Sequence, residues 1–338
     1  MNAKIGKVGS TDVAKLAGVS RSAVSRTFTP GAYVSQATRE KVLKAAESLG
    51  YQPNALARSL TTNRSNIIGV ITSNMENPFY ACLLQELIDR LHSKGLAPLV
   101  LPANETDNDD ILTQLASYQV DGIIVTNAHL SSKRISSFAK ANKPVIALNR
   151  YTEMDGVTAV TCDNVASSAQ VADLLVNMGK KNIAFIAGLP DTSSSRDRER
   201  GFTERLAARD VKIFAKATGY YTHSGGLDAA RQLFSGAIKP DAIFAANDLM
   251  AFAAIEVIER EQGLRIPQDV CVVGFDNSAP AGWPSYKLTS VDQNAPRMVD
   301  VTVDEIIARL SGEPQKTRHY NVLGKIVLRN STHNVKSN

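Results

Sequence analysis

Short runs of apolar residues alternate with stretches of helical periodicity through most of the chain, from Asn66 onward. One series of runs comprises Ile67–Ile71, Ala97–Leu101, Gly122–Thr126 and Val145–Leu148. A second series comprises Ala159–Thr161, Ile183–Ala187, Ala242–Ala245 and Val270–Gly274. Helical patterns fall between or after these runs, near residues 79–94, 108–118, 165–179, 198–209, 227–235 and 248–262. This alternation predicts βαβ units and therefore parallel sheets covered by helices.

The length of the chain calls for more than one core. Its 338 residues exceed one ordinary domain, so we expect two doubly wound parallel-sheet subdomains that face each other. Ligands in such folds sit beyond the carboxyl ends of the strands. Towards the end of the chain, Lys325–Arg329 is expected to form a final strand and residues 330–338 a polar tail.

The first 64 residues show a different, all-helical pattern. Apolar residues recur at helical intervals at Val13, Ala14 and Leu16 or Ala17. The hydroxyls of Ser10 and Thr11 precede them as capping groups, so the first helix is expected to begin near Thr11. Gly18 follows, and a residue without a side chain can take the positive φ that ends a helix.

A second helix is expected directly after this turn. Ser20 can cap it, while Val19 and Val24 supply its buried side. Its outer face then carries two arginines and two serines, at Arg21, Ser22, Ser25 and Arg26. These side chains can donate hydrogen bonds to guanine edges and phosphate oxygens. The pattern predicts a helix-turn-helix that enters a DNA major groove, and the alternative is a plain helical hairpin with a solvated face.

A third helix is expected from Ser35 to Leu49, and Gly50 ends it. Its apolar stripe comprises Val42, Leu43, Ala46 and Leu49. Farther on, Pro53 is acceptable at a first helical position and residues 55–60 favour helix. A helix of that length is marginal alone in water, so we expect it to form only when something binds it.

Charge divides the chain in the same way as periodicity. Residues 1–64 hold ten Lys or Arg against three Asp or Glu, a net charge of +7, and the rest hold 28 against 30, or −2. Solvated lysines on helices account for Lys41 and Lys44 individually, but they do not explain the asymmetry. A basic first segment is typical of proteins that bind nucleic acid, and such binding weakens steeply with salt.

Motifs spread along the chain form a specific set. They are Asp12-Val-Ala-x-x-Ala17-Gly-Val-Ser, Val24-Ser-Arg, Val34-Ser-x-x-Thr38-Arg, Gly50-Tyr-x-Pro-Asn54, Ala57, Ile68-Gly-Val, Asp121-Gly-Ile, Ala246-Asn-Asp248 and Val273-Gly-Phe-Asp276. Together they resemble the lac repressor and galactose repressor family of bacterial transcription regulators, and the resemblance covers nearly the whole chain.

The resemblance implies three parts, written in order along the chain. They are a helix-turn-helix headpiece at residues 1–52, a hinge helix and linker at 53–65, and an effector-binding and dimerisation domain at 66–338. The last part has a periplasmic-binding-protein-like fold, with a first subdomain at about 66–161 and 293–328, a second at about 162–292, and a polar tail at 329–338. The subdomains share crossovers, with residues 295–311 returning to the first.

The resemblance also implies a homodimer whose two recognition helices read the half-sites of a near-palindromic DNA operator, while Leu60 of each hinge wedges into the minor groove. The residues expected to contact DNA are Ser10, Thr11, Ser20, Arg21, Ser22, Ser25, Arg26, Tyr33, Ser35, Thr38, Asn54, Ala57 and Leu60. No heptad repeat follows the final strand, which favours a dimer. The helix near 79–94 is the expected dimer face, although burial inside its subdomain explains its leucines nearly as well.

Polar and aromatic residues gather at the expected strand ends. They are Asn77, Phe79, Tyr80, Thr126, Asn127, Asn149, Arg198, Tyr221, Asn247, Asp276 and Gln293. Asp, Asn and Arg can pair with neighbouring sugar hydroxyls, and an aromatic ring can cover the C–H face. The resemblance assigns Arg198, Asn247 and Asp276 to the effector and Tyr221 to a stacking wall.

The full expected effector set is Phe79, Tyr80, Thr126, Asn149, Arg198, Tyr221, Asn247, Asp276 and Gln293. For each of these, strand-end capping or polarity between the subdomains is the alternative. The expected ligand is a sugar, a sugar acid or a sugar phosphate. The arginines at 196, 198 and 200, after Ser193-Ser-Ser, favour an acidic sugar only slightly.

Two other classes of protein compete with a regulator. The sequence has no Gly-x-Gly-x-x-Gly, phosphate-loop, His-Glu-x-x-His or Gly-x-Ser-x-Gly motif, so we expect neither an enzyme nor a cofactor. A solute-binding protein of the transport type would share the two-lobed body. It would need an export signal, which the N-terminus does not offer, and would leave the basic segment without a purpose.

The remaining sequence features concern location and thiols. No apolar run is long enough to cross a membrane, so we expect a cytoplasmic protein without a membrane partner. Cys82, Cys162 and Cys271 are isolated and lack Cys-x-x-Cys spacing. Buried reduced thiols are therefore expected instead of metal ligands or disulfides.

Overall fold

The computed structural model describes residues 8–29, 31–52, 64–73, 75–103, 109–126, 138, 141, 143–152, 154–314 and 316–332. The chain divides into two compact units, Met1–Ser65 and Asn66–Asn338. The predicted hinge helix, with Asn54, Ala57 and Leu60, lies outside the described residues.

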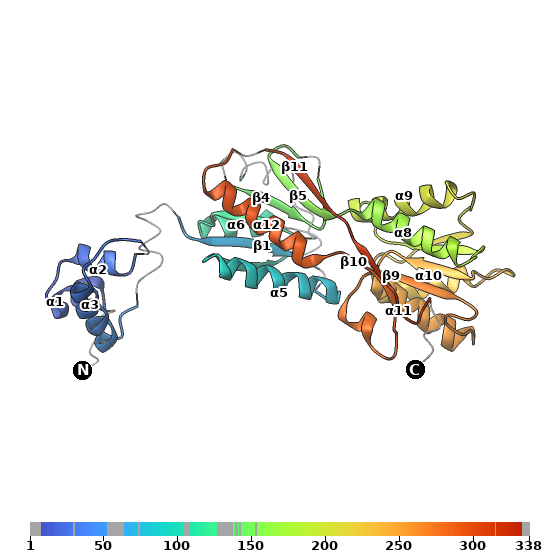
Figure 1. The fold of residues 1–338 in the computed structure, drawn as a ribbon, viewed down its shortest axis with the longest axis horizontal. Helices are drawn as coiled ribbons and strands as arrows, with labels where there is room; N and C mark the ends of the chain where they lie inside the picture. Colours follow the sequence, from blue (N-terminus) through green and yellow to red (C-terminus); the bar gives the residue numbers. More distant parts are fainter. Residues whose placement is uncertain are drawn as a thin grey trace. The chain divides into compact units, whose positions relative to one another are not determined.

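The described part of the first unit contains the helices α1 (Ser10–Ala17), α2 (Arg21–Thr27) and α3 (Gln36–Leu49) (Figure 1). Their buried side chains form one small core, Val13, Ala14, Val24, Val42, Ala45 and Ala46. Gly18 ends α1 at φ 64°, in the left-handed region where a side chain is strained. The Ser20 hydroxyl accepts a hydrogen bond from the Ala23 amide at 3.2 Å, so α2 is capped as its sequence indicates.

The cap of α1 differs from the expectation. Gly9 precedes the helix, and its amide donates to Oδ2 of Asp12 at 2.9 Å. Ser10 is therefore the first helical residue and not the cap. An acidic side chain in the first turn does the same work, because it accepts from an otherwise unpaired amide and favours the positive end of the helix dipole.

The apolar stripe of α1 is confirmed with one of its two alternatives, whereas that of α3 differs at one residue. Leu16 is 57% exposed, which leaves Ala17 as the residue packed against the core. Leu43 is 46% exposed, so its expected place in the stripe was wrong, and Ala45 is buried instead. Small side chains at Ala45 and Ala46 suit a core in which short helices approach closely.

In the second unit, the described strands form two sheets. The first has the order β11-β5-β4-β3-β1-β2 and is parallel throughout. Its strands are β1 (Ile67–Thr72), β2 (Ala97–Pro102), β3 (Gly122–Val125), β4 (Val145–Leu148), β5 (Val157–Cys162) and β11 (Arg318–Val322). The run Ala159–Thr161 therefore belongs to the first sheet and not to the second, because β5 pairs with β4.

The second sheet has the order β12-β10-β9-β8-β6-β7. Its strands are β6 (Ile183–Ala187), β7 (Ala215–Thr218), β8 (Ala242–Ala245), β9 (Cys271–Asp276), β10 (Thr289–Asp292) and β12 (Lys325–Val327). Only β12 among these runs antiparallel to its neighbour. The expected fold class, two doubly wound sheets behind a helix-turn-helix unit, is confirmed. In each sheet the strand order reverses beside β1 or β6, and ligands bind at the carboxyl ends of such strands.

Helices cover both sheets. They are α5 (Pro78–Ser93), α6 (Asp109–Ser117), α8 (Asn164–Asn177), α9 (Ser193–Ala207), α10 (His223–Leu233), α11 (Asp248–Glu256) with a π-helical end at Val257–Glu261, a 3₁₀ turn at Ala279–Gly282, and α12 (Ala295–Leu310). In Figure 1, α5 and α12 lie together on the first sheet, while α8 and α9 pair on the second. We call the first sheet with α5, α6 and α12 the first lobe, and the second sheet with α8 to α11 the second lobe.

The chain crosses between the lobes after β5, after β10 and after β11. Residues 295–311 return to the first lobe as expected, since α12 packs on α5. The expectation that residues 293–328 all belong there was wrong for β12, which pairs with β10 of the second lobe. The tail also begins later than expected, because Ser331 and Thr332 are buried and Arg329 donates to the Leu288 carbonyl at 2.7 Å.

A buried ion-pair cluster joins α12 to β5 and β11 in the first lobe. Glu305 accepts from Nη2 of Arg309 at 2.6 Å and from the Tyr320 hydroxyl at 3.0 Å. Arg309 also donates to the Thr158 hydroxyl at 2.9 Å, and Arg318 lies 3.2 Å from the second Glu305 oxygen. Removing one partner of such a pair leaves the other charge buried without its counter-ion, which is costly.

We therefore expect Glu305→Ala to lower the free energy of unfolding of the second unit by about 3–5 kcal/mol. Urea denaturation followed by circular dichroism measures this. Asp304→Ala is the matched control, because Asp304 precedes Glu305 on α12 and is largely exposed. Its Oδ1 lies 3.8 Å from Nη2 of Arg90. Equal small losses in both variants would contradict a structural role for the buried cluster.

Candidate DNA-binding helix and effector pocket

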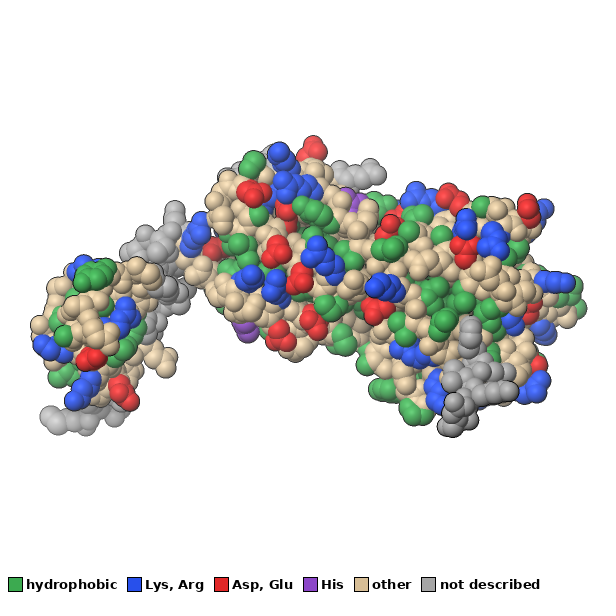
Figure 2. Space-filling model, in the orientation of Figure 1, with side chains coloured by type: hydrophobic (Ala, Val, Ile, Leu, Met, Phe, Trp, Pro, Cys, Tyr) green, Lys and Arg blue, Asp and Glu red, His purple; other side chains and the backbone are tan. Residues whose placement is uncertain are grey.

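The outer face of α2 is available to a partner. Arg21, Ser22, Ser25 and Arg26 are all exposed, and the Ser20 and Ser22 hydroxyls lie 2.8 Å apart. Figure 2 shows Lys and Arg side chains spread over the visible face of this unit. The helix presents donors and almost no apolar surface, as a helix that reads base edges does.

The inner face of α2 fixes its position on α3. Thr27 is buried and donates to the Ala23 carbonyl at 2.9 Å, while Arg39 of α3 donates to the Thr27 carbonyl at 3.1 Å. Phe28 packs on Tyr51 with ring centroids 5.9 Å apart. The end of the helix is thus held from α3, so that its exposed face is presented rigidly.

The other predicted DNA contacts lie at several places in the same unit. Thr11, Ser20, Tyr33 and Ser35 are exposed, and Tyr33 reaches 86% exposure, while Ser10 and Thr38 are half-buried. Ser35 caps α3, since its hydroxyl accepts from the Thr38 amide at 3.3 Å. Their contacts with DNA stay predictions.

A polar pocket lies between the two lobes at the carboxyl ends of the strands. It encloses about 300 Å³, including space open to solvent. The lining residues are Asn77, Tyr80, Asn149, Arg150, Ser194, Arg198, Tyr221, Asn247 and Asp276. Six of these, all except Asn77, Arg150 and Ser194, belong to the set expected from the sequence.

Arg198 of α9 is the most constrained of these side chains. It is 3% exposed, and its Nε donates to Oδ1 of Asn164 at 2.8 Å while Nη1 donates to the Ala246 carbonyl at 2.6 Å. Its guanidinium carbon lies 3.7 Å from the centroid of the Phe275 ring. Nη1 is also 3.6 Å from Oδ1 of Asp276, a distance at which the attraction is Coulombic and no hydrogen bond forms.

Asp276 faces this arginine from the end of β9. Gln293 donates to its Oδ1 at 2.6 Å, and Asn77 of the first lobe donates to its Oδ2 at 3.3 Å. Burial raises the pKa of Asp276 to about 6, although Arg198 and these two amides act in the opposite direction. Hydrogen bonds from both lobes therefore fix the orientation of the Asp276 carboxylate in the pocket.

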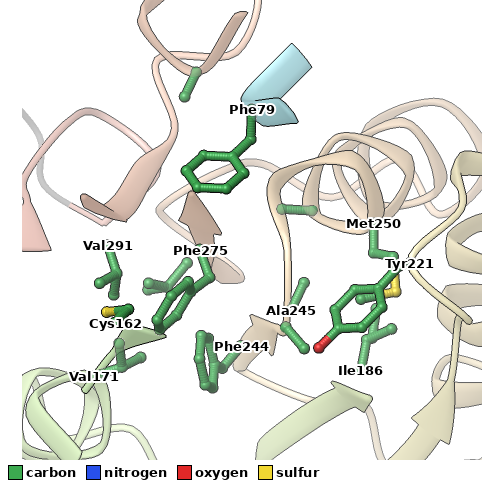
Figure 3. Packing of buried hydrophobic residues seen from close by; sticks show 14 of the residues in the cluster. Phe79, Cys162, Val171, Ile186, Tyr221, Phe244, Ala245, Met250, Phe275 and Val291 are labelled. Atoms are coloured by element: carbon green, nitrogen blue, oxygen red, sulfur yellow. The ribbon is translucent and has the colours of Figure 1, made fainter. Parts of the chain in front are cut away.

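Aromatic and amide groups complete the walls. The Tyr221 hydroxyl lies 3.3 Å from the Ser194 hydroxyl, and Asn247 donates from Nδ2 to the Tyr221 carbonyl at 3.3 Å. In the first lobe, Asn149 donates from Nδ2 to the Tyr80 hydroxyl at 3.2 Å. Figure 3 shows the Tyr221 ring beside Met250 and Ile186, which belong to the same buried cluster.

Three lining residues have backbones in the left-handed region that non-glycine residues seldom adopt. Asn149 has φ 70°, Tyr221 φ 63° and Asp276 φ 124°. Each such residue costs on the order of 1–3 kcal/mol and persists only where its surroundings determine it. Their gathering at one pocket indicates a functional site.

Three expected effector residues do not line the pocket. Phe79 is buried in the apolar cluster that also contains Phe275 (Figure 3). Thr126 is buried and its hydroxyl donates to the Thr72 hydroxyl at 3.0 Å. Gln293 is fully buried behind Asp276, which it orients. For these positions, the structure favours packing or support over direct contact.

Sequence reasoning missed Arg150 and Ser194, and left Asn77 outside the effector set. Each lies at a strand end or a helix start that the sequence pattern indicates. Arg150 follows Asn149 at the end of β4, Ser194 lies in the first turn of α9, and Asn77 caps α5 by accepting from the Phe79 amide at 3.0 Å. Asn164, the partner of Arg198, follows β5 in the same way.

Comparison with known proteins agrees with both parts of the chain. Residues 11–54 match the bacterial regulatory proteins of the lacI family, and residues 172–332 match a periplasmic binding protein-like domain. The regulator CelR of Thermobifida fusca is 32% identical over 311 residues, which cover 89% of this chain and 91% of that protein.

Solved structures are similar over the full length. A CelR–cellobiose complex is 29% identical with a TM-score of 0.72, and the lac repressor dimer bound to operator and the anti-inducer ONPF is 26% identical with a TM-score of 0.85. Both comparisons cover 96% of this chain and 99% of the other.

The chain belongs to the lacI family of bacterial regulatory proteins. It is a DNA-binding transcription regulator and not an enzyme, since that family consists of such regulators. Within the described ranges, no group of His, Cys, Asp and Glu is arranged to hold a metal ion, and no helix is long and apolar enough to span a bilayer.

The raised pKa of Asp276 predicts a pH dependence of stability. An unfolded aspartate titrates near 3.8, so the folded state takes up a proton between about pH 4 and 6 that the unfolded state does not. The stabilisation is complete below the unfolded pKa and is lost as pH rises through the folded one. We expect the Tm of the wild type to decline between pH 4 and 7 and that of Asp276→Asn to decline less. In unfolding free energy, this difference between the two proteins amounts to about 1–3 kcal/mol.

Calorimetry of the two proteins across this pH range measures the effect. Asp269→Asn is the control, because Arg265 lowers the pKa of that partly exposed carboxyl to about 2, so its contribution to stability falls as pH drops from about 5 and has the opposite sign. An unchanged Tm profile in Asp276→Asn would contradict the buried state of this carboxylate.

Proposed function

We propose that this regulator is a repressor whose affinity for operator DNA is lowered when a sugar-like effector binds between its two lobes. The observation that carries the proposal is the pocket in which Arg198, Asn247 and Asp276 converge. These groups can form paired hydrogen bonds with neighbouring hydroxyls, and Tyr221 offers a ring for a C–H face. The sugar in the CelR–cellobiose complex supports the same ligand class.

The mechanism that we propose is a shift between two arrangements of the lobes. Asn77 of the first lobe already contacts Asp276 of the second, and Tyr151 after β4 donates from its amide to the Ser193 hydroxyl of α9 at 3.1 Å. A ligand that replaces some of these contacts changes the relative energy of the arrangements. It can release DNA only if it binds one of them better than the other.

The regulator acts as a homodimer on a near-palindromic operator in this proposal. The lac repressor dimer bound to operator is the supporting comparison. On α5, Leu83, Leu87 and Leu91 are buried, whereas Leu84 and Ile88 are only half-buried and offer apolar surface to a partner. Such a regulator works where chromosomal DNA is, so we propose a cytoplasmic location.

Recognition of bases by α2 is tested at Arg21. An operator is first selected from a random duplex library, and affinity is then measured by fluorescence anisotropy. We expect Arg21→Ala to lose about 1–3 kcal/mol for the operator, with little change for unrelated DNA. Lys44→Ala, an equal charge change on the exposed side of α3, should weaken both alike. Identical losses from the two variants would argue against base reading by Arg21.

The pocket is tested by thermal shift with a sugar panel, defined as glucose, galactose, ribose, cellobiose, gluconate and a hexose monophosphate. A bound ligand raises Tm by mass action. We expect at least one member to raise the Tm of the wild type and Asp276→Ala to abolish that rise. Asp269→Ala, on the surface of the same lobe, should keep it. An undiminished shift in Asp276→Ala would refute this pocket as the effector site.

A further inference from the structure

The turn that presents Asp276 to the pocket has an unusual backbone. Asp276 has φ 124° and Asn277 φ 50°, so two consecutive non-glycine residues occupy the left-handed side of conformational space. Such residues persist only where surrounding contacts determine them. The contacts that hold this turn therefore decide where the effector-binding carboxylate points.

One buried carboxylate, that of Asp248, holds the backbone of this turn. Oδ2 of Asp248 accepts from the Ser278 amide at 2.7 Å and from the Ser278 hydroxyl at 2.8 Å. Oδ1 accepts from the Ser290 hydroxyl at 2.6 Å, and that hydroxyl in turn accepts from the Asn277 amide at 2.9 Å. The two backbone amides that follow Asp276 are thus linked to Asp248, directly or through one hydroxyl.

Asp248 itself is not among the residues that line the pocket, and it is 1% exposed. It is the first residue of α11, directly after Asn247, which lines the pocket and accepts from the Met250 amide at 3.0 Å. The carboxylate therefore connects the start of α11 with the turn after β9.

Strand β9, which leads into the turn, leaves space for the Asp248 carboxylate at Gly274. A Cβ on Gly274 would lie 2.3 Å from Oδ1 of Asp248, so only a residue without a side chain fits there. Ser290 comes from β10 and Ser278 from the turn, so three separate segments converge on one charged group. Hydrogen bonds to a charged acceptor are shorter and stronger than neutral ones.

We propose that Asp248 is a positioning residue for the effector site, which holds the turn Asp276–Ser278 so that the Asp276 carboxylate faces Arg198. The proposal rests on the proposed function, since it concerns the same pocket. Asp248 touches no ligand in this account and acts only through the turn.

The charges around the turn agree with this role. Burial, followed by the charge of Asp276, raises the pKa of Asp248 to about 7, while the Ser278 and Ser290 hydrogen bonds favour its charged form. Arg198 faces Asp276, and Asn277 is held by Nη2 of Arg329 at 2.7 Å and donates to Asp292 at 3.1 Å.

Hydrogen exchange resolved to single amides tests the positioning without any ligand. We expect Asp248→Ala to speed exchange of the Ser278 and Asn277 amides at least tenfold, while amides of α8 and β6 in the same lobe keep their rates. Asp248→Asn, which retains one acceptor oxygen, should give a smaller change, and Asp269→Asn none. Unchanged exchange at the turn, or equal acceleration across the lobe, would overturn the proposal.

Two further variants guard against a failure to fold. If Asp248→Ala is not folded, Ser290→Ala removes only the hydroxyl that links Asp248 to the Asn277 amide, and that amide should still exchange faster. In folded Asp248→Asn, carbon-13 titration of the Asp276 carboxyl should show a lower pKa than in the wild type, because a loosened turn exposes the carboxyl whose burial raises its pKa. A packing role alone would leave that titration unchanged, and such a result would count against the proposal.

The sugar panel connects this residue to function. Any panel member that raises the wild-type Tm should raise that of Asp248→Ala by less than half as much. If no member shifts the wild type, the proposed function fails, while the exchange and titration results still decide the role of Asp248.

Discussion

The burial of one positive charge organises the second lobe. An arginine removed from water costs several kcal/mol unless neighbouring groups compensate its charge. Arg198 meets that requirement with an amide from α8, a carbonyl from the end of β8, and the Phe275 ring and Asp276 carboxylate from β9. Because these partners come from separate elements, the pocket wall cannot form until all of them are in place. A binding site of this kind is prearranged before its ligand arrives.

The same constraint explains why strain collects around the pocket. Strand ends must turn sharply to bring polar side chains into the cleft, and Asn149, Tyr221 and Asp276 do so with left-handed backbones. The cost is offset by buried hydrogen bonds around them, which include the contacts to Asp248. Asn77 adds a contact from the first lobe to Asp276. A ligand that contacts Asp276 therefore affects both lobes at once, as regulation by an effector requires.

Periodicity and turn chemistry predicted the helices of the first unit, most strands and the two-sheet architecture, because these depend on local burial patterns. Strand pairing was harder to predict. The run Ala159–Thr161 has the pattern of any buried strand, and no local feature indicates that β5 pairs with β4. Strands β7, β10 and β11 went unrecognised, since Ala215–Thr218 and Arg318–Val322 alternate weakly and contain charged residues. Strand-end positions found Asn149, Asn247 and Asp276, whereas Asn164 and Asp248 act through contacts distant in sequence, which a single chain does not display.

The central claim is that the pocket around Arg198 controls the affinity of a separate DNA-binding unit. The most direct test is to titrate the operator affinity of wild type and Arg198→Lys with an active member of the sugar panel. Lysine keeps the charge but lacks the planar fork that reaches Asn164 and Ala246 together. The account predicts at least roughly fivefold weaker operator binding by wild type at saturating sugar, in the usual range of allosteric coupling, and no response in Arg198→Lys at unchanged sugar-free affinity. An equal response in both proteins would contradict it.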